Sequence, residues 1–296
     1  MKDAFSKLHP FVNLMFFVAV IGFSMFLMNP VCLVLSLICS FANAVYLNGA
    51  KTVRLSLVYL IPMIIFISVV TPVFSHQGVT ILTYFPWDNP LTLESILYAA
   101  ATSVLLATAV LWFSSFNTVM TTDKFVYLFG KIIPALSLVL SMSLRFVPKF
   151  TRQFKTVRAS QKCVGRDITD GNFFVKIKNG VKIFSIMLTW CLENAIETAD
   201  SMKSRGFGTT KRTAFSLFEF KTRDAVCLSF IVLTAGGVLL FNIFGVTQFC
   251  YYPSIKGDVL SINALICYTL YTALMLMPIT INMREGIKWK RLRSAI

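Results

Sequence analysis

Three adjacent residues, Ser204, Arg205 and Gly206, are the best candidates in this chain for specific polar recognition. An arginine side chain carries five N–H donors in a planar fork, which suits carboxylate and carbonyl groups. A glycine directly after the last turn commonly ends a helix, so Arg205 is expected to project from a helix end. A solvated arginine is the simpler interpretation of a lone Arg-Gly pair, and the surrounding segments have to decide between the two.

A long predicted helix, from about Phe173 to Lys203, leads to this segment and spans roughly 45 Å at 1.5 Å per residue. Its polar side is basic in the first half and acidic in the second, and anionic lipid should repel the acidic half. Small side chains in that half would let a groove or another helix approach closely. These features favour a protein-binding face over a helix that only lies on the bilayer. The apolar stripe predicted to form this face consists of Phe173, Ile177, Val181, Phe184, Leu188, Leu192, Ala195, Ala199 and Met202.

A second amphipathic helix is predicted before the first, with its apolar residues on one face: Phe146, Phe150, Phe154 and Val157. The stretch 132–147 that leads into it is apolar, but it is short and contains Arg145. We expect this stretch to lie half-buried at the membrane surface rather than to cross the membrane. The chain is therefore divided into an N-terminal membrane domain (1–148), a cytosolic domain (149–223) and C-terminal spans with a basic tail (224–296).

The composition indicates a membrane protein. Of the 296 residues, 56% are hydrophobic and 14% are charged, whereas a soluble domain has about 25% charged residues. Uncharged apolar stretches recur, and a helix of about 20 such residues crosses a bilayer. The predicted fold is an all-α polytopic membrane protein with two long amphipathic cytosolic helices and about six transmembrane helices, at 11–28, 31–47, 55–74, 95–113, 225–244 and 260–281.

The positive charge is concentrated in two regions. Of 28 Lys and Arg residues, 16 lie in 145–223 and five in 284–293. Because cytoplasmic loops of membrane proteins are enriched in basic residues, both termini and the segment 149–223 are expected to face the cytoplasm of the cell membrane, and only Lys256 falls on the other side. This distribution explains the net charge of +15 without nucleic acid as a partner.

The predicted spans contain no ionisable residue, which argues against a proton-coupled carrier and against an intramembrane hydrolase. The sequence has no phosphate-binding loop of the Walker type, two histidines far apart, and seven cysteines without a C-x-x-C pair. No bound cofactor or metal is therefore expected. The strongest polar groups in the spans are predicted to form hydrogen bonds between helices: Asn13, Asn43, Asn242 and Asn263.

Five short motifs, in this order, carry a resemblance: Leu8-His-Pro10, Phe74-Ser-His-Gln-Gly78, Thr92-Leu-Glu-Ser95, Leu144-Arg-Phe-Val-Pro148 and Ala199-Asp-Ser-Met-Lys-Ser-Arg-Gly206. With an uncharged membrane domain around a basic helical insert, the chain resembles the transmembrane T component of energy-coupling factor transporters for vitamins and metal ions. The likeness covers nearly the whole chain. A secondary carrier and a membrane anchor or assembly factor remain the alternatives, and an enzyme is third because no catalytic residue set is evident.

The resemblance implies specific partners. In that family the T component joins two ABC-type ATPases, which bind ATP and Mg²⁺, to a small substrate-binding membrane subunit, and it catalyses no reaction itself. Two cytosolic coupling helices each end in a motif centred on arginine, usually Ala-Arg-Gly, and each arginine enters a groove on one ATPase. The helices' apolar faces hold the substrate-binding subunit, which sets selectivity.

The second of these motifs matches as Ser204-Arg205-Gly206, but the first does not. At its place the chain has Cys163-Val164-Gly165, followed by Arg166. Either Arg166 replaces the missing arginine one residue late, or packing mainly holds the first ATPase. The two docking sites are therefore expected to be unequal.

Overall fold

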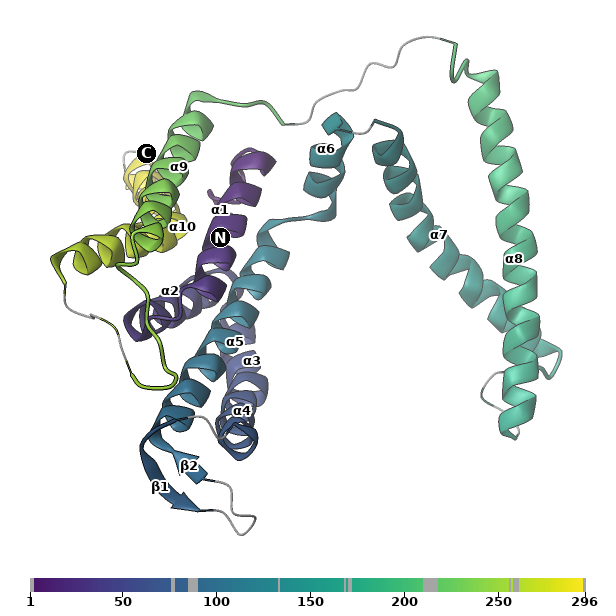
Figure 1. Ribbon diagram of the computed structural model, residues 1–296. Coiled ribbons are helices and arrows are strands. Elements are labelled where there is room, and N and C mark those ends of the chain that lie inside the picture. Colours follow the sequence, from purple (N-terminus) through teal and green to yellow (C-terminus); the bar gives the residue numbers. More distant parts are fainter. Residues whose placement is uncertain are drawn as a thin grey trace. The chain divides into compact units, whose positions relative to one another are not determined.

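The computed structural model describes residues 3–75, 78–84, 90–132, 134–167, 169, 172–209, 218–255, 257 and 261–294 (Figure 1). The chain divides into two compact units. We call Met1–Phe125 with Phe218–Ile296 the membrane unit, and Val126–Leu217 the insert unit. These borders follow the packing of the helices. The predicted borders 148/149 and 223/224 follow the membrane surface and stay a prediction.

The membrane unit is a bundle of apolar helices. Its first helix, α1 (Pro10–Phe26), has 17 residues. Five others in the described part of the chain are long and apolar enough to cross a membrane. The prediction of an all-α polytopic membrane protein is thereby confirmed. The five are α2 (Pro30–Asn48), the segment Ala50–Phe74, α5 (Leu93–Val119), α9 (Thr222–Ile243) and α10 (Ile262–Ser294).

Caps and prolines define where these helices begin. Pro10 and Pro30 occupy the first turn of α1 and α2, where a missing N–H costs nothing. The residue before each proline caps the helix, because the backbone N–H two positions later donates to the His9 ring and to the Asn29 amide oxygen. Thr92 caps α5, as its Oγ1 accepts from the backbone N–H three residues on, at 3.3 Å. The predicted cap at Thr92 is confirmed.

The third span is interrupted where the sequence predicts a kink or break at Pro62. It consists of α3 (Ala50–Leu55), a π-helical turn η1 (Ser56–Leu60) and α4 (Ile61–Phe74), with Pro62 in the first turn of α4. A proline supplies no N–H to the preceding turn and its ring crowds the carbonyl four residues back. The wider π turn before Pro62 accommodates both effects without ending the span.

The loop between α4 and α5 contains a short antiparallel hairpin, in which β1 (Ile81–Tyr84) pairs with β2 (Pro90–Thr92). The carboxylate of Glu94, in the first turn of α5, accepts from the Thr80 hydroxyl at 2.7 Å. Residues 75–94 contain no Lys or Arg, so the sequence predicts that this loop is external. His76, in one of the family motifs, lies outside the described residues.

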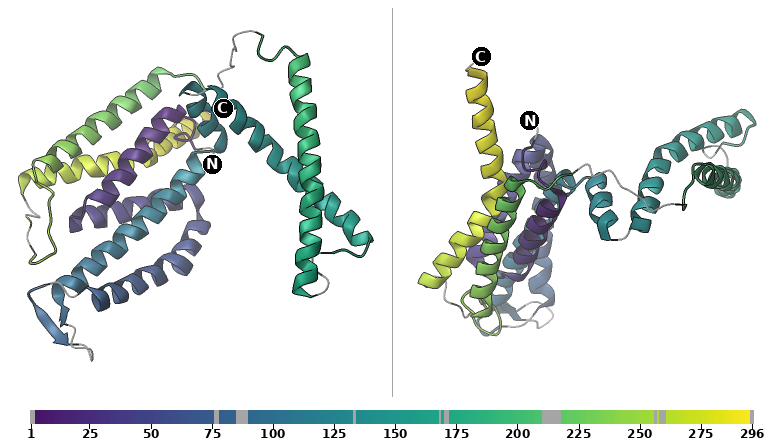
Figure 2. Two further views of the ribbon diagram at one scale, coloured as in Figure 1. Left: turned by 45° about the vertical axis from the view of Figure 1, so that its right-hand side comes forward. Right: turned by 90° about the horizontal axis from the view of Figure 1, so that it is seen from above.

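Aromatic side chains fill the centre of the membrane unit. Phe5 and Phe16 meet with ring centroids 5.2 Å apart, and Phe16 and Trp112 meet at 6.1 Å, in edge-to-face geometry. A second buried cluster of Ala44, Leu60, Ala107 and Leu111 joins α2, η1 and α5. Helices α9 and α10 lie side by side in the different views (Figures 1 and 2) and pack on α1 and α2.

Polar bonds hold the N-terminal lead, residues 3–9, against this bundle. The Phe5 backbone N–H donates to Asn282 Oδ1 at 3.0 Å, and the His9 backbone N–H donates to Asp224 Oδ1 at 3.2 Å. Lys124, in α6 (Thr122–Ile132), donates to the carbonyl oxygens of Ser6 and Val119. Burial lowers the pKa of Lys124 to about 8.

The four asparagines of the spans do not behave alike. With its amide oriented to satisfy its neighbours, Asn13 donates to the Phe5 carbonyl at 3.1 Å and accepts from Lys124 at 3.2 Å, so it bonds outside α1 as predicted. Asn242 instead accepts from Thr247 in the turn after its own helix, so its predicted interhelical bond is wrong. Asn43 is buried without a partner among the described residues, and Asn263 is exposed.

Three helices extend beyond their predicted ends. The basic segment 284–294 continues α10 as one helix rather than forming a separate tail (Figure 2). In the insert unit, α7 runs without a break from Pro134 to Cys163 with Pro148 inside it, so the apolar stretch from 134 to 147 is continuous with the predicted amphipathic helix, and its place at the membrane surface stays a prediction. The helix α8 (Phe173–Ser204) ends one residue past its prediction.

Candidate functional site

The insert unit consists mainly of α7 and α8, which cross each other (Figure 1). At the crossing, the Phe150 and Trp190 rings lie edge to face with centroids 5.5 Å apart. The Lys149 ammonium sits 5.4 Å from the centroid of the Trp190 ring and donates to the Asn194 side chain. Ile183, on α8, is 1% exposed. These contacts make the two helices a packed pair.

A groove of about 380 Å³ opens between the helices beside the crossing. On α7 it is lined by Met142, Phe146 and Phe150. On α8 its lining includes Ala195, Ala199 and Met202, the last three residues of the predicted stripe. The small alanine side chains leave space that larger residues would fill. The groove is apolar, and a side chain or helix of another protein could enter it.

The rest of the predicted stripe lies on a free surface of α8. The side chains that pack toward α7 are Ile183, Met187, Trp190, Cys191, Asn194 and Thr198, which are buried or half-buried. The stripe lies one residue further along the helix, about 100° around its axis. Within it, Val181 is 61%, Phe184 66% and Leu192 59% exposed, and Phe173, Ile177 and Leu188 are also exposed. The stripe is therefore not used to hold α7.

The C-terminal end of α8 is a Schellman motif. The Phe207 N–H donates to the Met202 carbonyl at 3.0 Å, and the Gly206 N–H donates to the Lys203 carbonyl at 2.9 Å. Gly206 has φ of 77°, in the left-handed region that glycine adopts without a Cβ penalty. Ser204 and Arg205 are exposed at this end.

The C-terminal end of α7 has the same geometry. The Arg166 N–H donates to the Gln161 carbonyl at 2.9 Å, and the Gly165 N–H donates to the Lys162 carbonyl at 2.9 Å. Gly165 has φ of 72°. Val164, before the glycine, is 64% exposed. The two helices of the insert unit thus end in one motif with different side chains.

Matching the two motifs at their glycines aligns the side chains. Val164 then takes the position of Arg205, and Arg166 takes the position of Phe207. Arg166 therefore leaves its helix end one residue after the glycine, where the second motif carries an aromatic ring. The first helix end therefore presents an exposed apolar side chain before its glycine, where the second presents an arginine.

Asp167 ties the end of α7 to the start of α8, and the sequence reasoning missed this role. Its carboxylate, 2% exposed, lies 3.4 Å from Arg158 Nε and 3.7 Å from Lys162 Nζ. Its backbone carbonyl accepts from Asn179 Nδ2 at 3.0 Å. The signal available in the sequence was an acid shortly after two basic residues of the helix, at spacings of five and nine. Because this turn holds the end of α7 near the start of α8, most of the length of α8 lies between the first motif and the second. That length is roughly 40 Å at 1.5 Å per residue.

Within the described ranges, no group of three or more metal-binding side chains comes together. The site thus consists of two exposed helix ends, an apolar stripe and an apolar groove. Such surfaces can bind proteins.

Comparisons with known proteins agree with this picture. Residues 1–215 match the family model of CbiQ, described as cobalt transport protein. The energy-coupling factor transporter transmembrane protein EcfT 1 of Listeria monocytogenes is 29% identical over 211 residues, which cover 66% of this chain and 75% of that protein. The EcfT proteins of Lactobacillus helveticus and Lactococcus lactis are 29% and 33% identical, over 37% and 33% of this chain.

In those two cases the match spans only 40% and 38% of the relative's own length. The family match, in contrast, extends through the membrane helices α1 to α5 and through both helices of the insert unit. The chain therefore belongs to the CbiQ family of cobalt transport proteins, as a transmembrane component of the energy-coupling factor type.

Proposed function

We propose that this chain couples two ABC-type ATPases to a small substrate-binding membrane subunit, and so supports uptake of a vitamin or metal ion across a bacterial cell membrane. The observation that carries the proposal is the pair of matching Schellman ends on two packed helices. Both ends expose their central side chain, and they lie at opposite ends of α8. The relatives named as energy-coupling factor transporter transmembrane proteins support the same function.

The physical steps follow from this arrangement. ATP and Mg²⁺ bind to the partner ATPases, and closure of the ATPase pair moves the two helix ends held in their grooves. Because α7 and α8 are packed at Phe150 and Trp190, movement of the ends changes the crossing. The stripe and the groove then move or release the substrate-binding subunit. Both termini lie in the cytoplasm, and this chain catalyses no reaction.

The two docking contacts differ in kind. Arg205 can place two N–H donors on a carboxylate or on backbone carbonyls inside a groove. Val164 offers only an apolar side chain at the matching position, so the other ATPase is held by packing. Gly165 and Gly206 allow both helix ends to turn through the left-handed region, where a Cβ would be strained. The missing side chains also leave room for a groove to approach both ends closely.

Co-purification tests the proposal. The tagged chain, expressed with its ATPases and the substrate-binding subunit, should retain two ATPases in mild detergent. A hydrogen bond to a charged group contributes about 1.5–3 kcal/mol, so Arg205→Ala should weaken one ATPase contact about ten- to a hundredfold. Arg152→Ala, which removes an exposed arginine from the side of α7, is the matched control.

A complex with Arg205→Ala that keeps both ATPases and full uptake would contradict the docking role. Uptake by the chain alone, driven by a sodium or proton gradient, would support a secondary carrier instead. Partners without ATP-dependent uptake would support a membrane anchor or assembly factor.

A further inference from the structure

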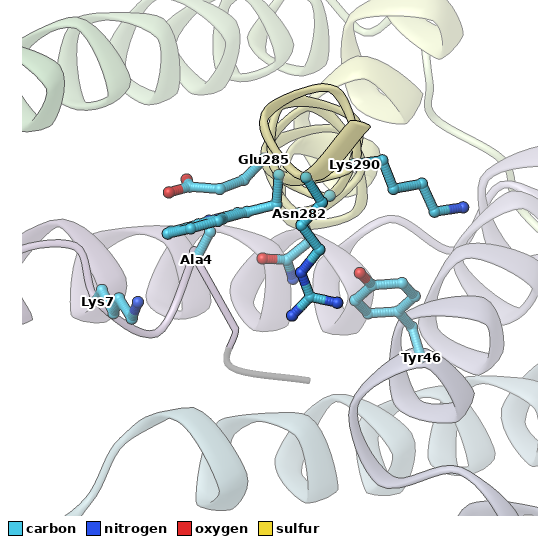
Figure 3. A pocket seen from close by; sticks show the side chains of 9 residues that line it. Ala4, Lys7, Tyr46, Asn282, Glu285 and Lys290 are labelled. Atoms are coloured by element: carbon cyan, nitrogen blue, oxygen red, sulfur yellow. The ribbon is translucent and has the colours of Figure 1, made fainter. Parts of the chain in front are cut away.

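A pocket of about 410 Å³ opens on the membrane unit where three segments meet (Figure 3). The segments are the N-terminal lead, the end of α2 and the last turns of α10. Its volume is in the range of small-molecule sites. The side chains that matter here are Lys7, Tyr46, Asn282, Trp289, Lys290 and Arg293.

The pocket favours an anion. It is lined by three cationic side chains, Lys7, Lys290 and Arg293, and by one carboxylate, Glu285. Glu285 already has a cation near it, since its Oε2 lies 3.5 Å from Arg223 Nη1. Figure 3 shows Lys7 on one side of the end of α10 and Lys290 on the other. Because the Lys290 side chain extends away from Lys7 in this view, an anion in the pocket would meet Lys7 and Arg293 directly, and Lys290 once its flexible side chain turned toward it.

A buried hydrogen-bond donor lines the same pocket. Asn282 is 5% exposed, and its Oδ1 accepts from the Phe5 backbone N–H at 3.0 Å. Its Nδ2 has no acceptor among the residues that the structure describes. An unsatisfied buried N–H is unfavourable, so an acceptor oxygen in the pocket would stabilise the site.

The pocket lies at the depth of lipid headgroups. Tyr46 is near the end of α2, and the basic residues Lys51 and Arg54 follow directly. The apolar part of α10 ends before Arg284, and Trp289 comes one turn later. Tyr and Trp prefer the level where the membrane meets water, and basic pockets between spans at that level suit phosphate headgroups.

We propose that this pocket binds a phosphate group, namely that of an anionic phospholipid headgroup. The Arg293 guanidinium can hold two phosphate oxygens, the two lysines neutralise the charge, and Asn282 Nδ2 donates to an oxygen. Trp289 and Tyr46 pack against the glycerol part. Free phosphate has the same chemistry and is the other possible source. The site does not depend on ATPase docking.

The test is a binding titration on the full chain in detergent, followed by native mass spectrometry. The probes are short-chain phosphatidylglycerol, short-chain phosphatidylcholine and inorganic phosphate. Phosphatidylglycerol should bind at least tenfold more tightly than phosphatidylcholine. The double variant Lys290→Gln/Arg293→Gln should weaken it at least tenfold. Arg284→Gln/Lys288→Gln removes the same charge from exposed positions of α10 outside this pocket and should change it less than twofold.

A third variant tests the buried donor. Asn282→Asp keeps the acceptor for the Phe5 N–H and nearly the same volume, but it removes the free donor and adds a negative charge, and both changes disfavour a bound phosphate. It should lower the affinity at least tenfold while the thermal unfolding midpoint confirms a folded chain. Inorganic phosphate that binds as well as the lipid, with the same dependence on the variants, would support the phosphate site with free phosphate as its occupant. Equal losses of affinity in both double variants would overturn the proposal. So would a failure of both phosphatidylglycerol and inorganic phosphate to bind.

Discussion

The two units of this chain differ in which polar side chains they bury and which apolar side chains they leave exposed. In the membrane unit, Asp224, Asn282 and Lys124 are at most 5% exposed, and each makes a hydrogen bond to a distant part of the chain. In the insert unit, large apolar residues such as Val181 and Phe184 are more than 60% exposed. These three side chains are therefore bonded within the membrane unit, although Asn282 Nδ2 has no acceptor among the described residues. The insert unit leaves its apolar surface for another molecule to cover.

The largest expected effect tests the self-sufficiency of the membrane unit. Asp224→Ala leaves the backbone N–H groups of His9 and Lys221 without their acceptor. Each buried donor left unsatisfied costs about 1–3 kcal/mol, so the free energy of unfolding should fall by about 2–4 kcal/mol. Thermal unfolding in detergent measures this change.

The control for this variant is Asp200→Ala, which changes an exposed aspartate on α8. The folded fraction of Asp224→Ala should still bind the ATPases normally. Equal unfolding midpoints for the two variants would show that the N-terminal lead contributes little.

The second prediction is a loss of binding without a loss of stability, the opposite of the first. Val181→Ser with Phe184→Ser should weaken binding of the substrate-binding subunit by about thirtyfold to several hundredfold, because covering the exposed part of both side chains contributes about 2–4 kcal/mol in total. The unfolding midpoint should not fall, since both side chains are exposed in the isolated chain. Co-purification of that subunit measures the effect. Ile196→Ser, at an exposed apolar position beside the stripe, should retain the subunit.

The third prediction compares the two helix ends. Val164→Asp should weaken one ATPase contact about tenfold, because the carboxylate would enter an apolar groove. Arg166→Ala should change the same contact less than twofold, since its side chain leaves the end one residue later. Quantitative co-purification of each ATPase measures both. A larger loss for Arg166→Ala would establish the displaced arginine as the docking residue.

The smallest expected effect concerns pH. The pKa of Lys124 is about 8 in the folded chain and about 10.4 in an unfolded one, so between these values the unfolded state binds more protons. The free energy of unfolding should therefore rise from pH 8 to pH 10, by on the order of 1 kcal/mol. Thermal unfolding across this range measures it, and Lys124→Met should remove the increase. ATPase binding should be the same in the Lys124→Met variant as in the unchanged chain.

Local patterns in the sequence determined many of the elements. Thr92 was predictable as a cap, Pro62 as an interruption of the third span, and Phe173 as the start of α8. Each depends on neighbours within one or two turns, where hydrogen bonds and steric clashes are set by residue type. The amphipathic helix predicted across Pro148 is part of α7, although a proline often ends a helix.

The candidate site was predictable in part. The stripe stood out by its spacing, and Arg205 by its place before a glycine at a helix end and by the family motif, but the docking and packing roles assigned to them stay predictions. Asp167 was missed, because its role in joining the end of α7 to the start of α8 depends on contacts with Arg158, Lys162 and Asn179 at the turn between the two helices. Asn242 was misjudged for the opposite reason, since a local partner in the next turn replaced the expected distant one.

The amino-acid sequence by itself determined the class of this protein: uncharged spans, basic segments between them and amphipathic helices follow from composition and periodicity. The sequence already matched Val164 with Arg205 through the glycine that follows each, and only the tertiary structure showed that both helices end with the same backbone hydrogen bonds. It also brought Lys7, Tyr46 and Arg293 to one pocket. Contacts between residues so far apart depend on how the helices pack, which no local pattern records.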